Sequence, residues 1–204
     1  MIGIVDYGSG NIAAIANIYK HLRVPCLASG DPELLAKADR YILPGVGAFD
    51  TVMNDLSKLG IIDMLNDEVI RKGKMAMGIC VGMQILAGSS EEGAGSGLGW
   101  IPGRVRRIDA SRLNRAPKLP HMGWNSIRPA DGQPIFADVD ADRGFYFLHS
   151  YYFDAESTDD VIATVSYGRE LACGVRRKNV FGFQFHPEKS HGNGLAIFKN
   201  FAEI

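Results

Sequence analysis

A cysteine, a histidine and a glutamate in this sequence have the residue types that an amide-cleaving thiol enzyme needs. Cys80 lies between Gly78 and Gly82, after an apolar run and before a helical pattern. A tight turn from a strand into a helix exposes a nucleophile in this way, and the glycines leave room for the turn. The helix that follows is expected to place the thiolate at its positive end, which favours the nucleophilic form.

His186 and Glu188 lie far downstream, at the end of another apolar run. Pro187 favours an extended backbone at His186, and residues two apart in an extended segment point to the same side. The carboxylate can then hold the imidazole while the imidazole faces Cys80, as a base and its orienting group do in thiol catalysis. Each motif alone has an ordinary alternative, because lone cysteines are often inert core and Pro-rich charged segments are often surface turns.

A glycine-rich turn adds a further element of a hydrolytic site. Gly45, Val46 and Gly47 follow an apolar run that ends at Leu43. Backbone N–H groups of such a turn can hold the oxyanion of a tetrahedral intermediate. Glycine also occurs in strand-to-helix turns for geometry alone, so the turn is weak as a lone motif.

A metal site is the main alternative use of these side chains. It would recruit Cys80, His186, Glu188 and His191. The two histidines are five residues apart on a predicted loop, and no second cysteine is near, so this spacing does not fit a zinc site. We expect neither a metal nor another cofactor.

The composition limits the classes of protein to which the chain can belong. Its 204 residues, 46% of them hydrophobic, predict one domain over residues 1–204. The net charge of −1 and the scattered basic residues argue against nucleic acid as a partner. The three widely spaced cysteines, Cys26, Cys80 and Cys173, fit reduced thiols, and no apolar stretch is long enough to span a membrane. We therefore expect a cytoplasmic protein.

The first half of the chain alternates short apolar runs with helical patterns. This order predicts an α/β fold, with a mostly parallel, doubly wound, flavodoxin-like sheet and a site at the carboxyl ends of its strands. The predicted strands are 2–5, 24–27, 41–43 and 75–79, and the predicted helices are 12–22, 49–59, 61–70 and 81–86.

The second half is rich in strand patterns and contains one closing helix. Residues 166–170 indicate a hairpin turn, and the glycine-rich residues 91–99 indicate a loop. We expect an antiparallel β extension over one side of the α/β core. The predicted strands are 105–108, 121–127, 145–148, 161–167, 171–175 and 180–185, and the predicted helix is 195–201.

Together these motifs resemble the class I, triad-type glutamine amidotransferases, over essentially the whole chain. The resemblance is closest to the glutaminase subunits of histidine biosynthesis. It rests on residues 5–11, 44–47, 78–84, 97–100, 120–125, 147–151 and 186–190.

The resemblance implies that Cys80 attacks the side-chain amide of glutamine, giving a thioester and ammonia, which water then resolves to glutamate. His186 would act as base and then as acid, steered by Glu188. The implied oxyanion and substrate-binding residues are Gly45, Val46, Gly47, Val81, Gln84, His149, Ser150 and Tyr151.

Ammonia released into neutral water mostly becomes ammonium, so we expect an acceptor protein and a docking surface. In the family this partner is a (β/α)8-barrel cyclase/synthase subunit that makes imidazole glycerol phosphate and aminoimidazole carboxamide ribotide. Aromatic and Met side chains often anchor interfaces, although core packing is an equal alternative for Trp124 and Met122. The candidate interface residues are Met122, Trp124, Asn125, Tyr146 and Lys189.

Other functions stay open at this point. His191 and the small residues 87–90 depart from the usual family pattern, which allows a paralogue that feeds a different synthase, such as one that makes an amidino sugar. A stand-alone thiol hydrolase and an idle binding module are further alternatives. An idle module is expected to have lost a member of the triad, and none is missing.

Overall fold

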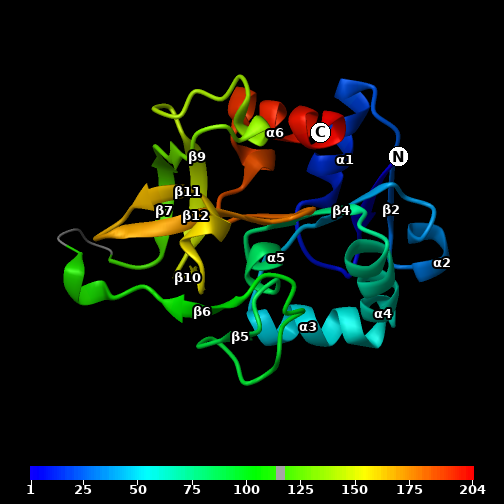
Figure 1. Cartoon of the computed structure of the whole chain (residues 1–204), viewed down its shortest axis with the longest axis horizontal. Coiled ribbons are helices and arrows are strands. Elements are labelled where there is room, and N and C mark those ends of the chain that lie inside the picture. The colour runs from blue at the N-terminus through cyan, green and yellow to red at the C-terminus, as the bar shows by residue number, and fades with distance from the viewer. Residues whose placement is uncertain (114–117) are drawn as a thin grey trace.

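A mixed sheet of eight strands forms the centre of the molecule (Figure 1). The computed structural model describes residues 1–113 and 118–204. The first five strands across the sheet run parallel, and the last three continue it antiparallel. In spatial order the strands are β2 (Cys26–Ser29), β1 (Ile2–Val5), β3 (Arg40–Leu43), β4 (Met75–Ile79), β13 (Val180–Phe183), β12 (Glu170–Arg177), β11 (Val161–Ser166) and β8 (Arg128–Pro129).

Helices cover both faces of the parallel part of the sheet. In Figure 1, α1 and α6 lie together above the sheet, while α3 and α5 lie below it. The α-helices are α1 (Ile12–Leu22), α2 (Pro32–Leu35), α3 (Phe49–Lys58), α4 (Ile61–Leu65), α5 (Val81–Gln84) and α6 (His191–Glu203). A π-helical segment, η1 (Asn66–Arg71), and four 3-10 turns, η2 (Ala110–Arg112), η3 (Pro134–Phe136), η4 (Thr158–Asp160) and η5 (Pro187–Lys189), complete the helical elements of the described residues.

The alternation of side chains along each strand creates two hydrophobic cores. Ile42 packs into the core shared with α1 and α6, whereas its neighbours Tyr41 and Leu43 pack into the core shared with α3 and α4. A strand buried on both faces needs apolar residues at every position, which explains the continuous apolar runs in the sequence.

Two small sheets lie beside the antiparallel strands. One contains β10 (Tyr151–Ala155), β6 (Gly103–Arg107) and β5 (Ser89–Ser90), and the other pairs β7 (His121–Asn125) with β9 (Phe145–His149). The predicted antiparallel extension is therefore divided: part of it lengthens the central sheet, and part forms these two sheets.

The predicted fold class is confirmed, and the differences concern individual elements. The second strand begins at Cys26, two residues later than expected, and the predicted helix 61–70 is divided between α4 and η1. Helix α6 begins at His191, four residues earlier than expected. The short α2 and the strand β10 have no counterpart in the prediction. No helix of the described residues is long and apolar enough to cross a membrane.

Candidate active site

Cys80 occupies a strained turn between β4 and α5. Its backbone has φ 56° and ψ −113°, a left-handed conformation that side chains rarely adopt. A Cβ atom on Gly82 would lie 1.9 Å from the carbonyl oxygen of Leu43, and one on Gly78 would lie 2.3 Å from that of Gly82. Both glycines are therefore needed for the turn. The amide of Cys80 donates to Phe183 O at 2.7 Å, which ties the turn to β13.

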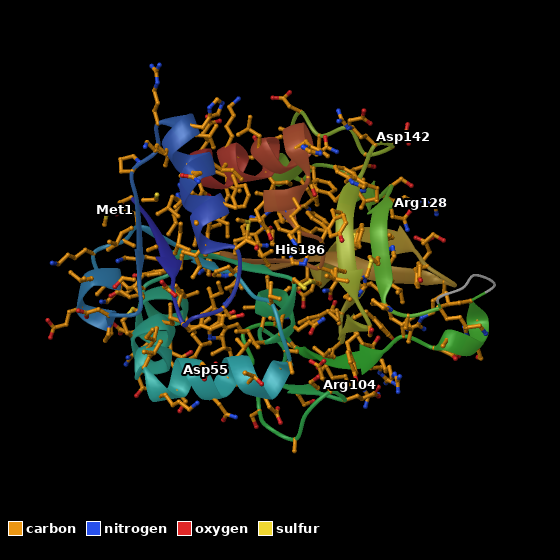
Figure 2. All side chains as sticks on the ribbon, turned by 180° about the vertical axis from the view of Figure 1, so that it is seen from behind. Met1, Asp55, Arg104, Arg128, Asp142 and His186 are labelled. Atoms are coloured by element: carbon orange, nitrogen blue, oxygen red, sulfur yellow. The ribbon has the colours of Figure 1, made fainter. Side chains whose placement is uncertain are left out.

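His186 lies beside this cysteine, near the middle of the molecule in Figure 2, and its residue is 2% exposed. Its Nδ1 atom is 2.8 Å from Oε1 of Glu188, and its side chain also hydrogen-bonds with Cys80. Because Nδ1 is used by the carboxylate, Nε2 is the ring nitrogen that serves the thiol.

The contact between His186 and Glu188 forms by a different route from the one expected. His186 itself is extended, with φ −103° and ψ 93°, but Pro187–Lys189 turns as η5 instead of continuing as a strand. Glu188 reaches the ring because the chain curls back, so the same-side argument for an extended segment was wrong.

Opposing effects set the charges of this pair. Burial alone lowers the pKa of His186 and raises that of Glu188, because it penalises both charged forms. Hydrogen bonds of His186 to Cys80 and to Glu188 outweigh burial and raise the pKa of His186 to about 9. The pKa of Glu188 is lowered by His186 and by Asn11, whose Nδ2 donates to Oε1 at 2.6 Å. Both hydrogen bonds therefore stabilise a proton on the ring of His186, which makes this imidazole a strong base.

A cavity of about 240 Å³ opens beside Cys80. It contains most of the substrate-binding residues predicted from the sequence. Its walls are formed by Gly47, Cys80, Val81, Gln84, Glu92, Pro120, Leu148, His149, Ser150 and Tyr151.

Two residues of the predicted oxyanion turn do not line this cavity. Gly45 is buried against Val81, where a Cβ atom would lie 2.3 Å from that side chain, and Val46 is 47% exposed at the surface. Val46 O accepts a hydrogen bond from the Ser9 hydroxyl, and Pro44 O accepts one from Tyr7. These bonds hold the turn by its carbonyl groups.

Gly47 and Val81 both line the cavity, and each has a backbone N–H group. Within residues 1–113 and 118–204, neither group donates a hydrogen bond. Gly47 has φ 123°, and a Cβ atom built there meets nothing within 4 Å. The cavity lining therefore contains two backbone amides with no hydrogen-bond acceptor in the described part of the chain.

Gln84 has most of its amide committed to the protein. Its Nε2 donates to Gln184 Oε1 at 3.0 Å and to Tyr151 O at 3.3 Å. The side-chain oxygen of Gln84 is thus the atom that remains for a ligand. Gln184 is fully buried, and its own Nε2 lies 3.8 Å from the sulfur of Cys80.

Glu92 is a charged wall residue that the sequence did not single out. It lies in the glycine-rich loop after β5, and its Oε2 accepts from Phe49 N, the first residue of α3, at 2.9 Å. Asp50 anchors the same loop by accepting from Ala94 N at 2.9 Å and Gly95 N at 3.1 Å. A carboxylate is therefore held at the edge of the cavity.

The candidate docking residues divide into outward-facing and inward-facing side chains. Met122 is 53% exposed and Trp124 is 44% exposed, so the core-packing alternative does not apply to them. Trp124 stacks on His191 with ring centroids 5.5 Å apart, and the Nζ atom of Lys189 lies 5.6 Å from the ring centroid of Tyr146.

Asn125 differs from the other docking candidates, because its amide points into the protein. Its Nδ2 donates to Ser166 O at 3.1 Å and lies 3.2 Å from His121 Nε2.

In the part of the chain that the structure describes, no group of three or more His, Cys, Asp or Glu side chains is arranged to hold a metal ion.

Comparisons with known proteins agree on one family. The family model for glutamine amidotransferase class-I matches residues 4–204. The chain is 47% identical over 204 residues to an imidazole glycerol phosphate synthase subunit HisH of Leptospira borgpetersenii, with all of both chains covered. A HisH subunit of Bdellovibrio bacteriovorus is 47% identical over 205 residues, again over the whole of both chains.

Solved structures with much lower identity share the fold. A glutamine amidotransferase structure superposes with a TM-score of 0.71 at 20% identity and covers 100% of this chain and 99% of its own. The PurLQS structure from Thermotoga maritima gives a TM-score of 0.65 at 19% identity, with 99% and 97% covered.

Proposed function

The chain belongs to the class-I glutamine amidotransferases and, among them, to the HisH subunits of imidazole glycerol phosphate synthase, and from this we propose that Cys80, His186 and Glu188 perform its chemistry. The protein is a glutaminase subunit, which releases ammonia from glutamine for use in histidine biosynthesis. The observation that supports the residue assignment best is the buried His186, which hydrogen-bonds to both Cys80 and Glu188.

The first half of the reaction forms a thioester. His186 takes the thiol proton through Nε2, and the Cys80 sulfur attacks the side-chain carbonyl carbon of glutamine. The negative oxygen of the tetrahedral intermediate lies between the N–H groups of Gly47 and Val81. The intermediate collapses when His186 returns the proton to the amide nitrogen, which leaves as ammonia.

The second half releases glutamate. Water attacks the thioester carbon while His186 accepts a proton from it, and the same two N–H groups stabilise the second oxyanion. The sulfur then leaves and takes the proton back from His186, so the triad returns to its starting state. Glu188 orients the ring throughout and stabilises its positive charge.

We also propose that Glu92 recognises the α-ammonium group of glutamine. Glutamine carries this cation at one end and the reacting amide at the other. Within the wall of the cavity, Glu92 is the carboxylate, and the Gln84 side-chain oxygen is a neutral acceptor nearby. A cation in a partly buried site is favoured by an opposing charge and by carbonyl dipoles.

The Glu92→Gln variant tests this contact. The substituted amide keeps an oxygen for Phe49 N and removes only the charge. We expect KM for glutamine to rise by about 10- to 100-fold with little change in kcat, because a hydrogen bond to a charged group is lost equally from ground and transition states. Steady-state glutaminase assays measure both constants.

Glu91→Gln is the matched control for this change. Glu91 is adjacent in sequence and accepts from Arg107 N at 2.8 Å, but it does not line the cavity. Its KM is expected to equal that of the wild type. Equal KM values for the two variants and the wild type would contradict the role of Glu92.

We propose that the acceptor of the ammonia is a (β/α)8-barrel cyclase subunit bound to the surface of Met122, Trp124, Tyr146 and Lys189. Exposed apolar and aromatic side chains of this kind are typical interface anchors. The surface is close to the active site, since the ring centroids of Tyr146 and His186 lie 6.4 Å apart.

The biosynthetic role and the free cysteines Cys26, Cys80 and Cys173 favour a cytoplasmic location.

The partner proposal predicts coupled activity. Glutaminase turnover is expected to rise about 10- to 100-fold when the barrel cyclase of the same organism and its nucleotide substrate are added. The measurement is glutamate production with and without the two additions. Equal turnover in both conditions would reject the coupling, and stimulation by a different synthase alone would favour the paralogue.

A further inference from the structure

A chain of hydrogen bonds runs under the wall of the glutamine cavity. His149 Nδ1 lies 2.7 Å from the carbonyl oxygen of Tyr151. His149 Nε2 lies 2.9 Å from Nδ1 of His121, and His121 Nε2 lies 3.2 Å from Nδ2 of Asn125. The chain ends at Ser166 O, to which Asn125 Nδ2 donates at 3.1 Å. It links β7, β9, the start of β10 and the last residue of β11.

The carbonyl groups at both ends fix where the protons lie. Tyr151 O can only accept, so His149 carries its proton on Nδ1. Burial lowers the pKa of His149 to about 4, so the ring is neutral and its Nε2 must accept. His121 therefore donates from Nδ1 and accepts at Nε2 from the Asn125 amide. From Asn125 to Tyr151 the donors thus all point the same way, and the second N–H of the Asn125 amide donates to Ser166 O.

His121 is locked in this arrangement by its neighbours. Its residue is 1% exposed, and its ring stacks on Tyr167 with centroids 4.0 Å apart and on Phe147 with centroids 4.7 Å apart. Rotation of the ring within this stack would break the hydrogen bonds on both sides. The pair of histidines consequently behaves as one fixed unit.

The end of the hydrogen-bond chain at Tyr151 holds the cavity wall beside Cys80. Tyr151 O, which accepts from His149, also accepts from Gln84 at 3.3 Å. One residue before His149, Leu148 O accepts from the thiol of Cys80 at 3.8 Å. A change at His149 would thus move wall groups that border both the substrate and the reacting sulfur.

The other end of the hydrogen-bond chain lies on β7, a strand whose two faces differ. Along β7, His121 is buried, whereas Met122 and Trp124 on the alternate face are exposed. The strand therefore carries candidate docking side chains on one face and the first donors of the hydrogen-bond chain on the other.

We propose that His121 is a positioning residue for glutamine binding, and that β7 connects partner docking to the glutamine cavity through the chain from Asn125 to Tyr151. His121 does not line the glutamine cavity, so it acts by holding His149 and the wall from Leu148 to Tyr151. The inference rests on the proposed glutaminase function and on its docking surface.

The His121→Phe variant in the complex with the cyclase subunit tests the proposal. Phenylalanine keeps the aromatic stack and removes the hydrogen bonds of the ring to His149 and Asn125. We expect KM for glutamine to rise about tenfold, because a buried acceptor at His149 loses its donor, and we expect partner stimulation to fall. Synthesis fed by ammonium salts is expected to keep its wild-type rate.

Two further variants separate positioning from general damage. His121→Asn places an amide nitrogen where Nδ1 was, so its KM for glutamine is expected to lie close to the wild-type value. Phe147→Leu disturbs the same stack but removes no hydrogen bond of the chain, so it is expected to lower Tm and leave KM unchanged. A KM in His121→Phe equal to that of Phe147→Leu would overturn the positioning role. A raised KM with unchanged partner stimulation would overturn the connection to docking.

A spectroscopic test on the protein without its partner is independent of activity. Long-range proton–nitrogen correlation spectra of ¹⁵N-labelled histidine at neutral pH are expected to show both His121 and His149 as neutral Nδ1–H tautomers. An Nε2–H tautomer at either ring would overturn the chain of donors. A wild-type complex without glutaminase activity would refute the proposed function instead, and this result is distinguishable because the tautomers would still be observed.

Discussion

Replacement of Cys80 by alanine is expected to reduce glutamine-dependent synthesis by about a thousandfold or more and to leave ammonium-fed synthesis intact. Only the sulfur is removed, since alanine and cysteine tolerate the left-handed backbone at this position similarly. Without the sulfur no thioester forms, so ammonia is no longer supplied. The proposed cyclase subunit is expected to use ammonia that enters from solution. The two rates are measured in the same complex with glutamine or with an ammonium salt as nitrogen source.

Cys173→Ala is the matched control for this experiment. Cys173 is fully buried in β12 and does not line the cavity, so its loss affects packing without chemistry. Both rates are expected to stay near those of the wild type. Glutamine-dependent synthesis that persists in Cys80→Ala would show that another group is the nucleophile.

The elements that position Cys80 could be predicted from the sequence because their patterns are local. Strand β1, helix α1 and strand β4 have the predicted bounds. In each of them the residues that decide the structure are neighbours, such as the continuous apolar run of a doubly buried strand. The turn at Cys80 was readable for the same reason, since Gly78 and Gly82 flank it closely.

The elements that were missed or misplaced depend on contacts that are distant in sequence. Helix α6 begins at His191 although Gly192 and Gly194 disfavour a helix, because Gly194 packs where a Cβ atom would lie 1.7 Å from Pro187 O. Strand β10 follows β9 after the single residue Ser150, so the pattern gave no separate boundary. Helix α2 has only four residues, although Asp31 caps it by accepting from Glu33 N at 2.8 Å.

The residues of the candidate site also divide into those predicted from local patterns and those placed by contacts that are distant in sequence. The contact between His186 and Glu188 was predicted because the two residues are close in sequence. In the structure the turn η5, and not an extended strand, brings the carboxylate to the ring. Asn11 is 177 residues from Glu188, and its hydrogen bond gave no sequence signal. Glu92 lies in residues 91–99, which the glycines indicated only as a loop, and its hydrogen bond with the distant Phe49 N gave no signal in the sequence. Side chains that fold back from distant elements therefore required the structure.

The His186→Asn variant is expected to reduce kcat for glutamine by about a thousandfold, with KM much less affected. Asparagine places an amide nitrogen near the position of Nδ1, so Glu188 keeps a donor and is not left unpaired in the interior. The lost atom is Nε2, which in the proposed mechanism takes the thiol proton and later returns it to the departing ammonia. Glu92 and Gln84, the proposed substrate contacts, lie elsewhere in the cavity wall and are unchanged. Steady-state kinetics of the complex separates kcat from KM.

The double variant decides whether His186 and Cys80 act as one unit. If the histidine works only through the sulfur, adding His186→Asn to Cys80→Ala causes no further loss, because the step that it serves is already absent. His21→Asn makes the same substitution at an exposed residue in the last turn of α1 and is expected to leave both constants unchanged. Additive losses in the double variant would mean that His186 contributes through glutamine binding or folding, and the base assigned to the thiol would have to be sought elsewhere in the cavity wall.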